Sequence, residues 1–183
     1  MMTLYHAGYD EIKQPDIHRG RINADFGQGF YTTDDRDFAY GWAIEKPGFE
    51  VIVNRYELDD RMLKIKVFDK NPEWYRYIFA NRRLVPDSFS EYDLIIGPIA
   101  CDTIYDTLGI ITSGFLSDEE AMELLLVGDS PRQVVLKTAK AAENLHFISS
   151  EILSKEQIER SRIRHEEENE KFQKEFAKAI EKL

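Results

Sequence analysis

Two glycines that bracket one polar residue are the most constraining feature of this chain. Gly27 and Gly29 stand on either side of Gln28 and lead directly into an aromatic, β-prone run at residues 30–33. Glycine has no Cβ, so it lets a backbone turn tightly or approach another group closely. The pattern predicts a close-approach loop that enters a strand, and it favours a flat ligand such as a nucleotide. A P-loop or dinucleotide-binding fingerprint does not fit, because the sequence has no GxxxxGK[ST] pattern and the glycines follow a loop.

The composition is that of a packed, acidic domain. Of the 183 residues, 43% are hydrophobic and 12% aromatic, so a single domain with a sizeable core is expected. The formal net charge of -10 disfavours nonspecific binding to nucleic acid or anionic membrane, because both depend on an excess of Lys and Arg. No apolar run approaches the roughly 20 residues of a membrane span, and no leader pattern follows Met1, so a cytoplasmic protein is expected. Cys101 is the only cysteine, which excludes an intramolecular disulfide and a cysteine-based zinc site.

Hydrophobic periodicity and capping signals predict that strands and helices alternate along the chain. Asn71 is the expected N-cap of one helix, with Pro72 in its first turn, and Ser117 with Glu120 forms a capping box for a later one. Strands are expected at residues 2–6, 30–33, 49–58, 62–68, 94–96, 133–138 and 145–148, and helices at residues 34–45, 73–83 and up to Gly128.

The chain changes character at Ser154, which forms a second capping box with Gln157 and opens a segment that is charged almost throughout. We therefore expect a domain over residues 1–152 and a charged helix over residues 153–183. Two interpretations of this helix stay open: a solvated helix that packs a few apolar residues on the domain, or a docking helix for a partner or a second copy. The apolar positions form only a weak coiled-coil seam, at Ile158, Phe172, Phe176, Ala179 and Leu183.

No metal site is expected. Glu166, Glu167 and Glu168 are consecutive, and consecutive positions on a helix point in different directions, so they predict a solvated face. His18 and His146 show no ligand spacing.

Three dispersed segments together resemble the motifs of ADP-ribosyltransferases of the diphtheria-toxin-like, His-Tyr-Glu type. They are Tyr5-His6-Ala7-Gly8, the run from Gly27 to Asp34, and the run from Ser130 to Val135. More closely, the chain resembles the bacterial family DUF3990, which is regarded as part of that superfamily, over roughly residues 4–147. The resemblance implies an α+β fold with a split β-sheet core, in which two packed sheets form a cleft surrounded by helices, and it implies NAD as cosubstrate.

The resemblance also implies roles for individual residues in binding NAD. His6 would hydrogen-bond the adenosine-side ribose, and the backbone of Ala7 would hold the nicotinamide carboxamide. Tyr31 and Trp42 would stack on the nicotinamide ring, each contributing roughly 0.5 to 1.5 kcal/mol. From the residues alone, however, His6 can also be a hydrogen-bonded histidine at a strand end, and the two aromatics can be core residues.

Two further positions complete the implied cofactor site. Arg21, with Arg19 as a spare, would form a fork to the pyrophosphate, although both also fit an ordinary surface loop. Gly29 would let the backbone approach the ligand. Related transferases often carry a serine three residues before the second aromatic, and this chain has Ala39 there, so one hydrogen bond to the carboxamide is in doubt.

The third motif departs from the family pattern at the position where active transferases commonly have glutamate. This chain has Gln133, whose carbonyl can accept a hydrogen bond from a ribose hydroxyl but whose amide cannot take a proton. Three consequences are open: an acceptor that is already nucleophilic, a base supplied elsewhere, for which Asp102 is the candidate, or loss of turnover. Gln133 can also be simply a polar residue that opens a strand.

The function implied is mono-ADP-ribosylation, with His6, Tyr31 and Gln133 as the catalytic set and NAD as donor to an unknown macromolecular acceptor, either protein or nucleic acid. By analogy with small bacterial transferases, the chain would be a toxin or defence effector, with an antitoxin protein as a partner. Alternatives are an NAD glycohydrolase, a catalytically inactive NAD or ADP-ribose-binding module, and a structural protein that associates through its charged helix.

Overall fold

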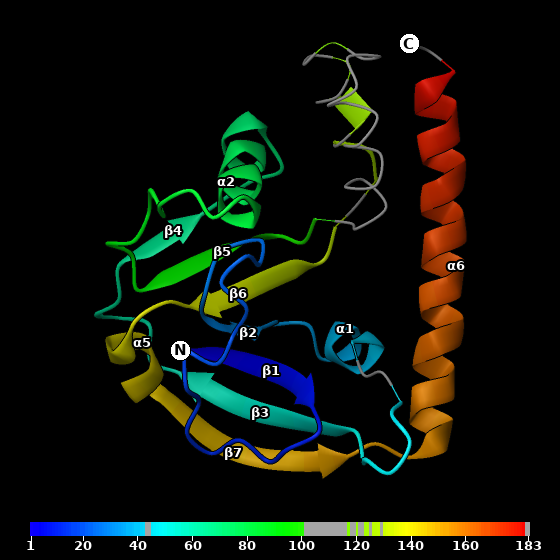
Figure 1. Ribbon diagram of the computed structural model, residues 1–183. Coiled ribbons are helices and arrows are strands. Elements are labelled where there is room, and N and C mark those ends of the chain that lie inside the picture. Colours follow the sequence, from blue (N-terminus) through cyan, green and yellow to red (C-terminus); the bar gives the residue numbers. More distant parts are fainter. Residues whose placement is uncertain are drawn as a thin grey trace.

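The computed structural model describes residues 1–42, 45–100, 117, 120, 123–124, 126–128 and 130–181. These residues form a mixed α+β fold with two β-sheets and four helices (Figure 1). The strands are β1 (Met2–Gly8), β2 (Phe30–Thr32), β3 (Ile52–Leu58), β4 (Ile65–Val67), β5 (Leu94–Pro98), β6 (Arg132–Leu136) and β7 (Leu145–Ile152). The helices are α1 (Arg36–Gly41), α2 (Pro72–Arg82), α5 (Ala139–Glu143) and α6 (Lys155–Ile180).

The edges of the two sheets are joined by one backbone bridge. One has the antiparallel order β1-β3-β7, and the other has the order β2-β6-β5-β4, in which only the β4 and β5 pair is parallel. An isolated bridge joins β1 to the end of β2: the Tyr5 N–H donates to the Thr33 carbonyl at 2.8 Å, and the Thr33 N–H donates back at 3.0 Å. Among the described residues, this edge-to-edge junction of two hydrogen bonds is the backbone pairing that joins the two sheets.

Alternation along the strands divides the interior into three apolar clusters. The largest lies between the two sheets, with Leu4 and Tyr56 from one sheet and Val134 and Leu136 from the other. A second cluster lies under α2 on the opposite face of the four-stranded sheet, and its members include Phe26, Trp74, Tyr77, Ile95 and Val135. The third lies under α1, where Ala39 packs on Val53 and on Leu153. The four-stranded sheet is thus covered on both faces.

The predicted start of helix α2 and its predicted buried face are both confirmed. The Asn71 side chain accepts a hydrogen bond from the Trp74 N–H at 3.0 Å, and Pro72 occupies the first turn. Trp74, Tyr77 and Ile78 are all buried.

The predicted bounds of other elements need correction. The first helix begins two residues later than expected, because Asp35 is extended and caps the helix through the Phe38 N–H at 3.0 Å. The third strand begins at Ile52 rather than residue 49, because a turn with Gly48 at φ 82 precedes it. The short helix α5, capped by Thr138, was not expected. Of the helix predicted to end at Gly128, most lies outside the described residues, although both hydrogen bonds of the Ser117 and Glu120 capping box are present.

The charged helix α6 packs along the domain (Figure 1). It has the predicted capping box at Ser154 and is about 39 Å long. Ile158 packs on the cluster under α1, Arg164 forms an ion pair with Asp37 at 3.1 Å, and Phe176 is buried. These contacts favour the interpretation of α6 as a solvated helix that rests a few residues on the domain. Across the described residues, no helix combines the length and hydrophobicity that crossing a membrane requires.

Candidate functional site

His6 lies at the junction of the two sheets, with its ring fixed on both sides. Its ring centroid is 4.6 Å from that of Phe30, and its Nδ1 is 2.7 Å from the Tyr31 carbonyl oxygen. Because a carbonyl can only accept, Nδ1 carries a proton. Burial lowers the pKa of His6, so the ring is neutral at pH 7 and its Nε2 is an acceptor. An acceptor at this position suits a hydroxyl group of a ligand.

Ala7 presents its backbone where β1 and β2 separate. In an antiparallel pair, the N–H and C=O of alternate residues point to the same side of the strand. Tyr5 directs both groups to Thr33 on the β2 side, so Ala7, two residues on, directs its own to that side as well. There the Tyr31 carbonyl is bound by the His6 ring instead of by a β1 backbone group. The result is a donor and an acceptor side by side, which is the pair that a primary carboxamide requires.

Tyr31 is fixed by the glycine loop that precedes it. Its hydroxyl donates to the Gly27 carbonyl at 2.7 Å and accepts from the Phe26 N–H at 2.9 Å. Its ring packs against the cluster under α2, and burial raises the pKa of the hydroxyl. Gly27 has φ 70, which explains why the loop needs glycine there. The tyrosine therefore sets the shape of the loop as well as offering an aromatic ring.

Gly29 is required by packing within the protein. A Cβ at this position would lie 2.7 Å from both the Leu136 carbonyl oxygen and the Val135 side chain. The close approach predicted from the glycine pattern is thus an approach of the loop to β6.

Gln133 is almost completely buried, with 2% of its surface exposed. Its Nε2 lies 3.4 Å from the Asp25 carboxylate. The Tyr31 and Val135 pair places Gln133, two residues before Val135, on the same face of the sheet as Tyr31. The structure therefore brings Tyr31 and Gln133 to one face, while the His6 ring lies against Phe30 on the other.

The remaining predicted residues lie around this junction. Arg21 is exposed, and its charge acts on the Tyr31 hydroxyl, although burial dominates the pKa of that group. Trp42 is half-buried at the C-terminal end of α1, and its ring meets Phe38 edge-on at 4.8 Å. Among the described residues the rings of Tyr31 and Trp42 are not in contact, as is required of two rings that hold a planar ligand between them, and their stacking role stays a prediction. Asp102 lies outside the described residues.

A buried polar network lies behind the loop that contains Gly27, and it was not predicted from the sequence. The Asp25 carboxylate accepts two hydrogen bonds from Arg82, at 2.8 and 2.5 Å, and one from the Ala100 N–H at 3.2 Å. Lys137 has a side chain only 7% exposed, binds the Phe26 carbonyl and pairs with Asp87 at 3.1 Å. Burial lowers the pKa of Lys137. No local spacing links these residues, because they come from separate parts of the chain.

Within the part of the chain that the structure describes, no cluster of His, Cys, Asp and Glu side chains is large enough to hold a metal ion. The groups at the junction are instead neutral acceptors, backbone polar groups and aromatic rings. These suit an uncharged, planar part of an organic ligand.

A family model described as a protein of unknown function (DUF3990) matches residues 2–147, and the chain belongs to this family. The match covers both sheets up to the third residue of β7. No curated protein matches the chain.

Proposed function

We propose that this member of the DUF3990 family is an NAD-dependent mono-ADP-ribosyltransferase. The observation that carries the proposal is the junction of β1 and β2, where the Ala7 backbone, the His6 Nε2 acceptor and the Tyr31 loop lie together. The Ala7 donor and acceptor pair matches the nicotinamide carboxamide, and the neutral His6 ring matches a ribose hydroxyl. Both match the roles that the three sequence motifs imply.

NAD supplies a leaving group that is already cationic, so the glycosidic bond breaks through an oxocarbenium-like transition state without a general acid. To break this bond, the residues of this chain therefore need only bind and orient the donor. His6 and Ala7 do so through fixed hydrogen-bonding groups, and the Tyr31 hydroxyl holds the Gly27 loop in one conformation. Orientation of this kind is itself a large source of rate.

A second candidate, a catalytically silent NAD or ADP-ribose-binding module, is favoured by Gln133. The side chain cannot take a proton at neutral pH, and it is buried against Asp25. An active transferase with this residue would need an acceptor that is already nucleophilic or a base from elsewhere in the chain.

The biological role follows from analogy at the level of the family. As a toxin or defence effector in the cytoplasm, the protein would modify a protein or nucleic acid and would be neutralised by an antitoxin protein.

The proposal is tested by incubating the purified full chain with labelled NAD and measuring free nicotinamide, free ADP-ribose and label on macromolecules from a lysate. Transfer predicts nicotinamide release with label on a macromolecule. Release of both small fragments would instead establish hydrolysis, and NAD binding by calorimetry without turnover would establish the silent module.

His6→Ala is the matched variant, with His146→Ala on the exposed part of β7 as control. We expect His6→Ala to lose NAD binding and His146→Ala to keep it. A His6→Ala protein that is folded and fully active would overturn the site.

A further inference from the structure

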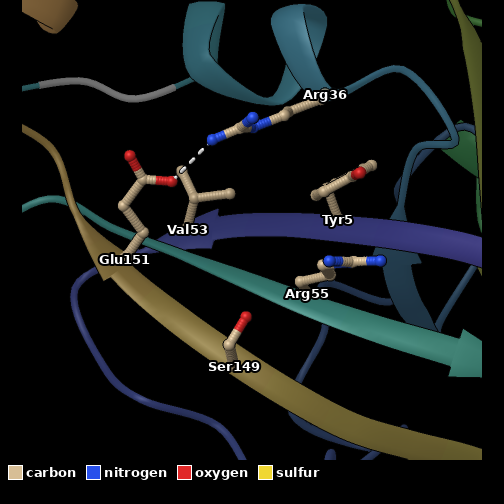
Figure 2. Close-up of a pocket in the computed structure, with 6 residues that line it drawn as sticks. All are labelled: Tyr5, Arg36, Val53, Arg55, Ser149 and Glu151. Carbon is tan, nitrogen blue, oxygen red and sulfur yellow. Dashed lines mark hydrogen bonds and ion pairs between the residues drawn. The ribbon is translucent and has the colours of Figure 1, made fainter.

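The outer face of the three-stranded sheet carries a small polar pocket that the proposed NAD site does not use (Figure 2). Its volume is about 140 Å³. Pockets that take a whole cofactor or drug-sized ligand measure roughly 300 to 1,000 Å³, whereas about 150 Å³ holds a group the size of benzene. The pocket therefore suits one small chemical group. It is lined by Tyr5, Arg36, Val53, Arg55, Ser149 and Glu151.

Strand register builds the pocket. Tyr5, Arg55 and Ser149 stand opposite one another on β1, β3 and β7, and Val53 faces Glu151 one step further along. Residues two apart on a strand share a face, so all five rise from the same side of the sheet. Arg36 reaches over this face from α1 (Figure 2).

The charges of the pocket are unequal. Arg36 already has partners within the protein, because its guanidinium donates to Glu151 at 2.9 Å and to the Tyr40 hydroxyl at 2.9 Å. Arg55 is exposed, and among the residues that the structure describes it makes no ion pair. Two guanidinium groups thus face one carboxylate in a chain whose formal net charge is -10. A small anion is the ligand that this local excess of positive charge attracts.

The pocket lies beside the proposed NAD site. Continuing the register of β2 with β6 by one residue places Thr33 opposite Gln133, and Thr33 bridges to Tyr5, which stands opposite Arg55. Gln133, Thr33, Tyr5 and Arg55 therefore follow one another across four neighbouring strands. At about 4.8 Å per strand, Arg55 is about 14 Å from Gln133 along this row. A molecule held by its anionic end at Arg55 can extend to the junction of the sheets.

We propose that the pocket binds the phosphomonoester of a nucleotide, free or at the end of a nucleic acid strand. Phosphate has the right size, and a guanidinium fork matches its oxygens. The Ser149 hydroxyl lies next to Arg55, and the Tyr5 ring offers a surface for stacking a base. A single pocket also fits the acidity of the chain, which disfavours a long track of backbone phosphates. That the bound molecule is the acceptor rests on the proposed transferase function, whereas phosphate binding does not.

The test measures binding of inorganic phosphate, cytidine 5′-monophosphate and a short 5′-phosphorylated oligonucleotide by calorimetry or fluorescence anisotropy. The same oligonucleotide with a 5′-hydroxyl is expected to bind at least tenfold more weakly. Arg55→Met should weaken binding of the phosphorylated probes at least tenfold, because it removes a charged hydrogen-bonding group. Arg76→Met, on the exposed side of α2, is the matched control and should bind like the wild type.

Glu151→Gln supplies a test with the opposite sign. Removing the carboxylate should tighten phosphate binding about two- to fivefold, since exposed charge pairs contribute on that scale. Equal binding by the wild type and Arg55→Met would overturn the pocket, and tighter binding of a phosphoserine peptide than of the nucleotides would overturn the nucleotide assignment.

The two proposals fail separately. A wild-type protein that binds the phosphate probes but not NAD contradicts the transferase and leaves the pocket. A protein that binds and turns over NAD with no effect of Arg55→Met on phosphate binding contradicts the pocket and leaves the transferase. We expect Arg55→Met to bind NAD as tightly as the wild type does.

Discussion

The two sheets of this protein are covered differently. In the four-stranded sheet, β5 and β6 are buried on both faces, with Leu94, Ile95, Val134, Val135 and Leu136 all fully inaccessible. The three-stranded sheet is buried along one face and only in part on the other. Its outer face is covered by α1 at one end and carries the exposed residues Arg55 and Ser149 at the other.

The difference separates stability from chemistry. Continuous apolar strands between two layers supply most of the burial that stabilises a fold. A sheet with one open face can instead place polar side chains in a fixed row, at little cost to the core. Apart from Gln133 on β6 and Arg36 on α1, the proposed functional groups accordingly lie on β1, β3 and β7 or where β1 meets β2.

The largest expected effect is on the buried sheet. Ile95→Ala should lower the free energy of unfolding by about 2 to 5 kcal/mol, because it leaves a cavity between two apolar layers. Arg55→Ala on the open sheet should change it by less than about 0.5 kcal/mol. Denaturant unfolding followed by circular dichroism measures both values. Similar losses from both substitutions would contradict the division between the sheets.

The polar network behind the loop should respond next most strongly. Asp25→Asn keeps the shape of the side chain but leaves Arg82 facing an uncharged amide in a mostly buried position. A loss of about 1 to 3 kcal/mol in unfolding free energy is expected. Asp37→Asn, whose side chain is 72% exposed, is the control and should be near neutral.

Removing one hydroxyl at the edge of the buried sheet should have a moderate effect. Tyr31→Phe loses the hydrogen bonds to Gly27 and Phe26, so a cost of about 1 to 2 kcal/mol is expected. The loop should also become mobile, and amide hydrogen exchange at residues 26–28 reports this directly. Unchanged exchange there would show that the ring, rather than the hydroxyl, sets the loop.

The smallest expected effect on the free energy of unfolding concerns His6, at the junction of the two sheets. Burial lowers its pKa in the folded state, so the unfolded chain binds the proton more readily. The associated stability is present above the unfolded pKa of about 6.5 and is lost as pH falls through the folded pKa. The slope is at most about 1.4 kcal/mol per pH unit. The free energy of unfolding should therefore differ less between pH 7 and pH 5 in His6→Gln than in the wild type. An identical pH profile in the variant would refute the lowered pKa of His6.

Much of the fold could be predicted from local signals. The caps at Asn71 and Ser154 and the inward face of α2 follow from residues within one or two turns of each other. The strand order and the single bridge between the sheets could not be predicted, because they depend on pairing between residues far apart in sequence, such as Tyr5 with Thr33. The helix α5 could not be predicted for a different reason, because its five residues are too few to carry a recognisable periodic pattern.

The candidate site was predictable in its residues but not in its arrangement. Sequence identified His6, Tyr31 and Gln133 by their motifs. It did not indicate that Gln133 is buried against Asp25, because that contact spans 108 positions. Nor did it indicate the pocket at Arg55, which depends on the register of three strands. The family assignment is established, whereas the NAD chemistry stays a prediction.

The contacts of α6 matter for anyone who shortens this chain. A fragment that stops at residue 152 keeps every strand that the structure describes but loses Ile158 from beneath α1 and the ion pair of Arg164 with Asp37. Gln157, which donates to Glu151 at 2.9 Å, is lost as well. Because α1 carries Arg36 at one end and Trp42 at the other, trimming the charged tail would disturb both ends of that helix, and a truncated protein that fails to bind its ligands would say nothing about the sheets.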